Sequence, residues 1–195
     1  HDIITVMQEY VKEGVKLILS QQLDVSKIHC ESYHCVFGFD HPKLKPYKHK
    51  FAQGIVLDKS LIINTIKTDP DPTRRAAAVF LVGEFKSAQE IVALLRTHVA
   101  DGDDEVRNNV MRVIASTMHK SGIKKIDVKP FIALLDSPYE ADRNKALFVL
   151  YEAADVPYQN KTIRLLAEAK LRCLAKLKQP NNKVFAMQIL DKIKN

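Results

Sequence analysis

Apolar residues recur at spacings of three and four along most of the chain, which is the pattern of helices that bury one face. The first such stretch predicts a helix over residues 2–22, with Ile3, Met7 and Tyr10 on its apolar side. Gly14 lies inside this helix, where glycine costs about 1 kcal/mol relative to alanine. We expect Gly14 to let a neighbouring backbone approach closely.

From residue 55 onward, one helical pattern follows another with short breaks that contain Asp, Pro, Asn or Gly. Such breaks both end helices and supply side chains that cap the next one. The predicted helices cover residues 60–67, 73–85, 87–99, 105–119, a short stretch after Asp127, 139–153, 158–178 and 183–194. The chain is therefore expected to be all-α.

The segment between these two parts breaks the helical pattern. It holds five aromatic residues, four histidines and two cysteines. We expect a short strand over Tyr33–Phe39, and Pro42 and Pro46 are expected to exclude a continuous helix. The expected organisation is an N-terminal capping helix, an irregular loop region and a helical array in one domain, over residues 1–22, 23–57 and 58–195 respectively.

A short motif, D-x-x-x-R-x-x-A, recurs at the starts of the later helices. Its first copy has Asp71, Arg75 and Ala78, its second Asp103, Arg107 and Val110, and its third Arg143 and Ala146 with Tyr139 in place of the Asp. The stretch from Pro180 to Gln188 is a degenerate fourth copy without the Arg. Self-similarity at this spacing is typical of repeat proteins, in which stacked units bury a continuous core.

This motif resembles the HEAT family, including the short bacterial HEAT-like, armadillo-type repeats, over residues 58–195. The copy with Val106 and Arg107 matches that family's pattern best. The resemblance implies an α-solenoid of about four helical hairpins, preceded here by the N-terminal helix and the irregular insert. We interpret the repeated aspartates as helix caps and the repeated arginines as contacts between repeats, so all of them are structural: Asp71, Arg75, Asp103, Arg107 and Arg143.

Composition excludes several classes of protein. With 46% apolar and 27% charged residues, six Gly and eight Pro, the chain is neither collagen-like nor disordered. No apolar run reaches the length of a membrane span. Three cysteines cannot form a disulfide framework. The first residue is His, so a cytoplasmic protein, which we favour, and an exported one both stay open.

The net charge of +7 is concentrated at the C-terminal end, because residues 156–195 hold nine basic and only two acidic residues. A second basic cluster lies within residues 41–50. Such asymmetry suggests an anionic partner, although a solvated basic face would look the same. The candidate partner-binding residues are Lys43, Lys45, Lys48, Lys50, Lys161, Arg164, Arg172 and Lys176.

Two His-Cys pairs, five residues apart, are the most unusual feature of the irregular region. His29, Cys30, His34 and Cys35 could bind zinc or copper, but their spacing is not that of the usual zinc motifs. The two cysteines could instead form a disulfide, or remain buried or partly buried thiols, which we favour. Cys173 is expected in the core.

No known catalytic or phosphate-binding motif is present, and the sequence favours a protein without enzymatic activity and without a cofactor. We interpret the acidic turn at residues 101–105 as helix capping rather than a calcium loop. The oligomeric state stays open.

Three functions are compatible with these features. The first is a non-enzymatic scaffold whose solenoid surface binds a protein partner, expected to be acidic. The second is nucleic-acid binding through the basic C-terminal face, because the resemblance includes the bacterial alkylpurine DNA glycosylases built from HEAT-like repeats. The third, by analogy with the HEAT-like phycobilin lyases, has no motif here to support it.

Overall fold

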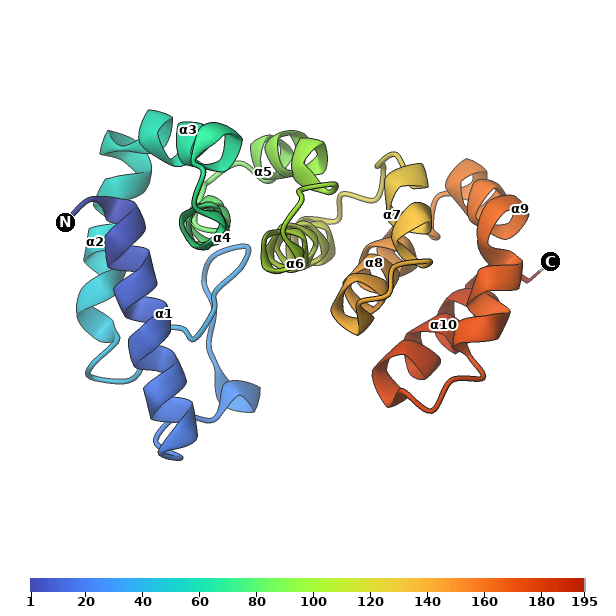
Figure 1. The fold of residues 1–195 in the computed structure, drawn as a ribbon, viewed down its shortest axis with the longest axis horizontal. Helices are drawn as coiled ribbons and strands as arrows, with labels where there is room; N and C mark the ends of the chain where they lie inside the picture. Colours follow the sequence, from blue (N-terminus) through green and yellow to red (C-terminus); the bar gives the residue numbers. More distant parts are fainter. Residues whose placement is uncertain (195) are drawn as a thin grey trace. The chain divides into compact units, whose positions relative to one another are not determined.

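The computed structural model describes residues 1–194, and every regular element in them is helical (Figure 1). The all-α prediction is therefore confirmed. In chain order the elements are α1 (Ile3–Leu19), η1 (Val25–Lys27), α2 (Lys45–Leu57), α3 (Lys59–Thr68), α4 (Pro72–Val82), α5 (Ala88–Leu95), η2 (Arg96–His98), α6 (Asp104–Ser121), α7 (Lys129–Leu134), α8 (Glu140–Ala153), α9 (Pro157–Leu174) and α10 (Pro180–Lys192).

The chain divides into two compact units, and the boundary falls inside α5, after Ile91. This boundary lies within the segment that we expected to be one helical array. Among the described helices, none has both the length and the hydropathy needed to cross a membrane.

The first unit is built around α1, which packs against α2 and α4, while α3 packs against α4. Tyr10 of α1 is fully buried, and four aromatic rings surround it at centroid distances of 5.2–5.9 Å. They belong to Phe37, Phe39, Tyr47 and Phe51. Gly14 makes room for one of them: a Cβ there would lie 2.1 Å from Cδ2 of Phe37. The prediction that a backbone approaches here is wrong, because the space is taken by the side chain of Phe37.

The predicted loop region 23–57 is wrong in its last 13 residues, which form α2. Pro46 lies in the first turn of this helix, where a missing N–H costs nothing because no intrahelical acceptor exists for it. The predicted strand at Tyr33–Phe39 is also wrong. There the hydroxyl of Tyr10 takes the place of a pairing strand: it donates to the carbonyl of Gly38 and accepts from the amide of Phe37.

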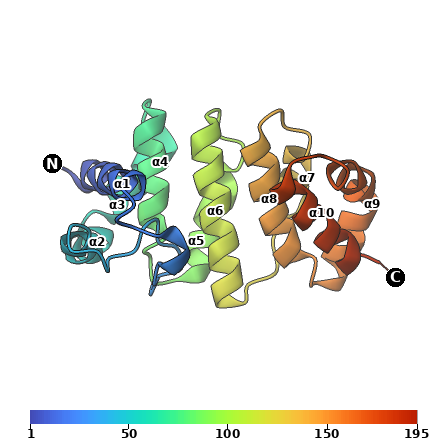
Figure 2. The same ribbon diagram turned by 90° about the horizontal axis from the view of Figure 1, so that it is seen from below.

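The second unit has a row of three helices, α6, α8 and α10, in which α8 packs between the other two (Figure 2). α7 and α9 form a second layer against this row. The row and the layer share a core of fully buried side chains, among them Ile114, Leu147, Ile163 and Leu171. The helix bounds agree with the predicted ones to within four residues.

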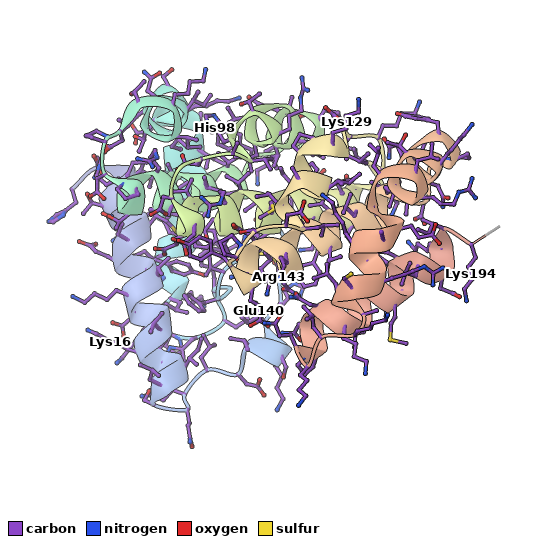
Figure 3. All side chains as sticks on the ribbon, turned by 45° about the vertical axis from the view of Figure 1, so that its right-hand side comes forward. Lys16, His98, Lys129, Glu140, Arg143 and Lys194 are labelled. Carbon is purple, nitrogen blue, oxygen red and sulfur yellow. A yellow bond between two sulfur atoms is a disulfide. The ribbon has the colours of Figure 1, made fainter. Side chains whose placement is uncertain are left out.

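The arginines of the repeated motif make the same contact three times. In each case Nη1 donates to the carbonyl six residues upstream: Arg75 to Asp69, Arg107 to Asp101 and Arg143 to Ser137, at 2.8–2.9 Å. Arg143, labelled in Figure 3, also donates to the side chain of Gln179, as the start of α8 faces the turn before α10. Each of these arginines therefore connects the start of its helix to the turn just before it.

The two aspartates of the motif cap helices as predicted. Asp71 accepts from the amide of Thr73, and Asp103 accepts from the amide of Val106. The acidic turn before α6 is thus accounted for by capping.

Candidate functional site

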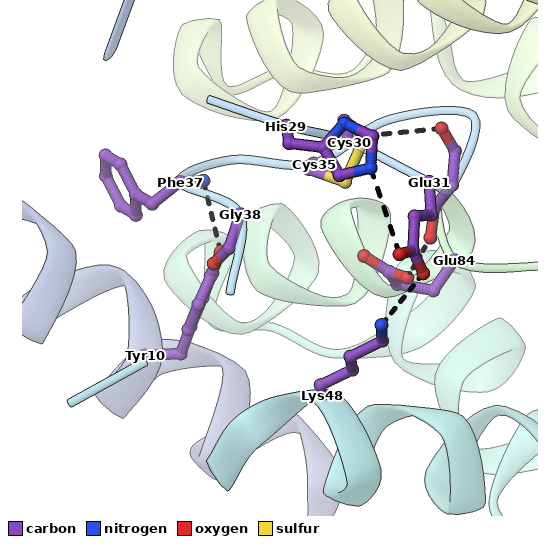
Figure 4. The surroundings of a disulfide bond; sticks show 10 residues. Tyr10, His29, Cys30, Glu31, Cys35, Phe37, Gly38, Lys48 and Glu84 are labelled. Atoms are coloured by element: carbon purple, nitrogen blue, oxygen red, sulfur yellow. Dashed lines mark hydrogen bonds and ion pairs between the residues drawn. A yellow bond between two sulfur atoms is a disulfide. The ribbon is translucent and has the colours of Figure 1, made fainter. Parts of the chain in front are cut away.

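The two cysteines of the irregular region form a disulfide, Cys30–Cys35 (Figure 4). The favoured interpretation as free thiols is therefore wrong. Disulfides form and persist chiefly in oxidising compartments. The third cysteine, Cys173, is exposed on α9 instead of lying in the core as we expected, because it lies beside the buried stripe of that helix, to which Leu171 and Leu174 belong.

The histidines beside the disulfide do not join the cysteines in a metal site. His29 is exposed and lies 3.8 Å from the carboxylate of Glu31, whereas His34 is buried and stacks on Phe80 with 5.6 Å between the ring centroids. In residues 1–194 no group of three or more His, Cys, Asp or Glu side chains is arranged to hold a metal ion. The disulfide also removes both thiolates as ligands, so we do not propose metal binding at these four residues.

A small cleft opens between the disulfide loop and α2, with His29, Glu31, Lys48 and Glu84 on its walls. Nζ of Lys48 donates to Glu31 at 2.8 Å, and this hydrogen bond lowers the pKa of the Glu31 carboxyl (Figure 4). The cleft has a volume of about 110 Å³. That is well below the roughly 300 Å³ of a typical small-molecule site.

The basic cluster at residues 41–50 lies in the first unit, at and just before the start of α2. Two of its candidate residues are paired, Lys43 with Glu13 at 3.6 Å and Lys48 with Glu31. Lys50 lies over the ring of Tyr47, 5.2 Å from its centroid, and Lys45 is exposed. Two of the four candidate lysines in this cluster are thus paired with carboxylates.

The other four candidates, Lys161, Arg164, Arg172 and Lys176, come from α9 and the turn that follows it, in the second unit. Their spacing places them along the exposed side of the helix. Arg172 donates to Glu168 at 2.8 Å, so the ridge also contains a local ion pair. Leu165 lies on the same side and is 71% exposed.

A groove of about 500 Å³ runs between α9 and α10, beside this ridge. Glu168 and Arg172 line it from α9, and Met187 lines it from α10, 53% exposed. Lys194, just after the end of α10, contributes a second ion pair to the rim, with Asp191 (Figure 3). Leu190 and Ile193 also line it, so the groove combines apolar side chains with charged ones.

Two buried carboxylates of α8 have hydrogen-bonded partners on other segments. Asp142 binds Arg107, and Glu152 binds Lys124 and His119. Burial raises the pKa of Glu152, but the hydrogen bonds from Lys124 and His119 more than offset it, so the net shift is downward. Neither carboxylate lines either of the two clefts. Both groups connect α8 to α6 and to the segment that follows α6.

Sequence reasoning missed a cluster of aromatic and basic side chains on α8 and α10. Nζ of Lys145 lies 4.9 Å from the ring centroid of Phe148, whose ring meets that of Phe185 at 4.3 Å. Nζ of Lys192 lies 3.4 Å above the ring of Tyr151. The spacing of three between Lys145, Phe148 and Tyr151 is the signal that could have revealed it. It is inconspicuous because apolar residues occur all around α8.

No protein-family model matches this sequence, and no curated protein is significantly similar to it.

Proposed function

We propose that the protein is a non-enzymatic binding module, a HEAT-like α-solenoid that holds an acidic amphipathic helix of a protein partner against α9 and α10. One observation carries this proposal: Met187, which is 53% exposed, lines a groove between two helices, and the exposed Leu165 lies on the side of α9 whose Glu168 and Arg172 line the same groove. Grooves of this kind receive the apolar face of a helix.

The solenoid part of the proposal rests on recurrence. The same arginine-to-carbonyl contact is found at three helix starts, 32 and 36 residues apart. In the second unit, successive helices of the row are also linked by their motif residues, Arg107 to Asp142 and Arg143 to Gln179. Stacked hairpins with such links commonly serve as extended binding surfaces.

The positive charge of the last forty residues favours an acidic partner. Of the nine basic residues in the last forty, four have no carboxylate partner among the described residues, namely Lys161, Lys176, Lys178 and Lys183. They lie on or after α9 and on α10, the two helices that border the groove. A partner with carboxylates flanking an apolar stripe complements this distribution, and electrostatic attraction speeds its association.

A labelled synthetic helix tests the proposal. The probe is an amphipathic peptide of about 18 residues with a leucine stripe flanked by glutamates, and its binding is followed by fluorescence anisotropy. We expect the double variant Leu165→Gln/Met187→Gln to raise Kd at least tenfold. The control Leu19→Gln, on a leucine of α1 that is 78% exposed, should leave Kd unchanged. Equal affinities for the wild type and the double variant would overturn the proposal.

Nucleic-acid binding, as in the HEAT-like DNA glycosylases, is the second candidate, because Lys161, Arg164 and Lys176 share one ridge. Glu168 interrupts that ridge and pairs with Arg172, which weakens it as a track for phosphates. Duplex DNA in the same assay, at roughly 50 and 200 mM salt, separates the two functions. Micromolar DNA binding that falls steeply with salt and is lost in Lys161→Glu/Lys176→Glu would replace the proposed function.

A further inference from the structure

The cluster on α8 and α10 combines an ammonium group with an aromatic surface, all within the second unit. Lys145 and Phe148 are one helical turn apart on α8, and Phe185 of α10 meets Phe148 at an interplanar angle of 63°. All three side chains are half-buried. An arrangement of this kind offers apolar contact and a positive charge side by side.

The charge of Lys145 is not compensated by the fold. Among the described residues no carboxylate pairs with Lys145, and its Nζ lies 3.3 Å from the amide oxygen of Asn144. Burial lowers the pKa of Lys145, and the positive charge of Arg112 lowers it further. The fold thus holds this ammonium group where its charged form is disfavoured.

The neighbouring amide adds a second donor. Asn144 is only 7% exposed, and its Nδ2 has no hydrogen-bond acceptor among the described residues. A buried donor without an acceptor costs roughly 1–3 kcal/mol. Nζ of Lys145 and Nδ2 of Asn144 are therefore two adjacent donors, and neither of them donates to a carboxylate.

Lys192 shows what such a lysine looks like when it is compensated. Its Nζ lies over the ring of Tyr151, as Nζ of Lys145 lies over Phe148, but it also donates to the carboxylate of Asp155 at 2.8 Å. The two lysines thus make the same contact with an aromatic ring, and only Lys192 has the carboxylate.

We propose that the face of α8 and α10 around Lys145, Phe148 and Phe185 is a second binding site, for a peptide that carries a carboxylate beside an aromatic side chain. The carboxylate would do for Lys145 what Asp155 does for Lys192, and the ring would pack on the two phenylalanines. A peptide is favoured over a nucleic acid because one uncompensated lysine matches one carboxylate. A phosphate backbone requires a row of cations.

The site lies apart from the groove between α9 and α10, since none of its three residues lines that groove. The inference does not rest on the proposed function, and either can fail without the other.

The smallest probe of the site is N-acetylphenylalanine, which carries one carboxylate beside one phenyl ring. Its control is N-acetylphenylalaninamide, which has the same ring without the charge. Reductive ¹³C-methylation keeps the lysine charges and gives each lysine an NMR signal, and the variant Lys145→Gln identifies the signal of Lys145. We expect the acid to shift that signal saturably and to raise the pKa of Lys145, because a bound carboxylate stabilises the ammonium form. The amide should do neither.

Two variants refine the test. Neither variant has the Lys145 signal, so their binding is followed by the backbone amide shifts of α8 and compared with the same shifts in the wild type. Lys145→Arg should bind the acid within about threefold of the wild type, because it keeps the charge, whereas Lys145→Gln should bind at least tenfold more weakly. That tenfold loss corresponds to about 1.4 kcal/mol.

Equal shifts by the acid and the amide, or no shift by either at concentrations on the order of 50 mM, would overturn the proposal. So would a saturable, salt-sensitive shift by a short oligothymidylate combined with none by the acid. That result would assign the face to single-stranded nucleic acid.

Discussion

Arg107 holds the carboxylate of Asp142 through two guanidinium nitrogens, with Nε and Nη2 3.2 and 3.0 Å from Oδ2. The carboxylate also accepts from the hydroxyl of Ser137 at 2.6 Å, and it is almost completely buried. The pair joins the start of α6 to the start of α8, 35 residues further along the chain. The second unit thus contains an ion pair whose carboxylate is held away from solvent.

Removing this carboxylate should destabilise the protein strongly. Asp142→Ala leaves the guanidinium of Arg107, itself only 12% exposed, without its carboxylate partner. Breaking a buried ion pair in this way typically costs several kcal/mol, and we expect a loss of about 3 kcal/mol in the free energy of unfolding. Urea unfolding measures it. Glu168→Ala, which removes an exposed pair, should cost less than about 1 kcal/mol; similar losses in both variants would contradict this interpretation.

Gly14→Ala should destabilise the first unit although alanine favours helices. The new Cβ would overlap the ring of Phe37, so the ring or the helix must move. Overpacking of this kind costs about 1–3 kcal/mol, more than the gain of about 1 kcal/mol in helix propensity. Gly102→Ala is the matched control, because nothing lies within 4 Å of its added Cβ. Thermal unfolding of the two variants gives the comparison, and a Gly14→Ala protein as stable as the wild type would refute the prediction.

Because Cys30 and Cys35 form a disulfide, only one of the three cysteines should be a free thiol. Denatured protein that has not been reduced should react with Ellman's reagent at one thiol per chain, Cys173, and the reduced protein at all three. Closing so short a loop stabilises by about 2 kcal/mol in the chain-entropy account. Cys30→Ser/Cys35→Ser should therefore lose about that much, whereas Cys173→Ser should change stability by less than about 0.5 kcal/mol. Three reactive thiols before reduction would rule the disulfide out.

Stability should fall on the acid side as Glu152 takes up its proton. The pKa of this carboxyl in the folded protein lies below its ordinary value of 4.5, so its contribution is present above pH 4.5 and is lost as pH falls through the lower, folded value. The Asp2 carboxyl, held by Arg74 and by the amide of Thr5, acts in the same direction with a pKa of about 2.

The variant Glu152→Gln isolates the first of these contributions. Wild type and variant should differ most in unfolding free energy above pH 5, and their curves should converge as pH falls toward 3. A difference that is the same at both pH values would show that the charge of Glu152 contributes nothing.

The helices were predictable because their buried faces repeat along the sequence, and the caps at Asp71 and Asp103 were visible as residue types. α2 was missed because Pro46 ends a helix in the interior but is tolerated in a first turn, and the sequence does not say where the first turn lies. The shape of residues 33–39 depends on the hydroxyl of Tyr10, a partner 27 residues away from Phe37 that no local pattern points to.

The residues of the candidate sites could be predicted from the sequence, but the ion pairs that they form could not. The basic residues could be identified, yet which of them are compensated depends on Glu13, Glu31 and Glu168, whose positions follow from the packing. The spacing of Lys145 and Phe148 is visible in the sequence, but the ring that packs on Phe148 is that of Phe185, 37 residues further on, and only the fold brings it there. The disulfide was one of three open readings, and only the fold decides among them.

The arginines that reach back six residues have a consequence for how the chain assembles. Because each of them ties a helix start to the turn just before it, that part of the structure needs no distant segment to close. Contacts between near neighbours in sequence favour rapid folding, and chains of this kind fold progressively during synthesis. We therefore expect the second unit to fold from its N-terminal end as it leaves the ribosome. The arginine-to-carbonyl hydrogen bond of each turn would then form before the next helix packs against it.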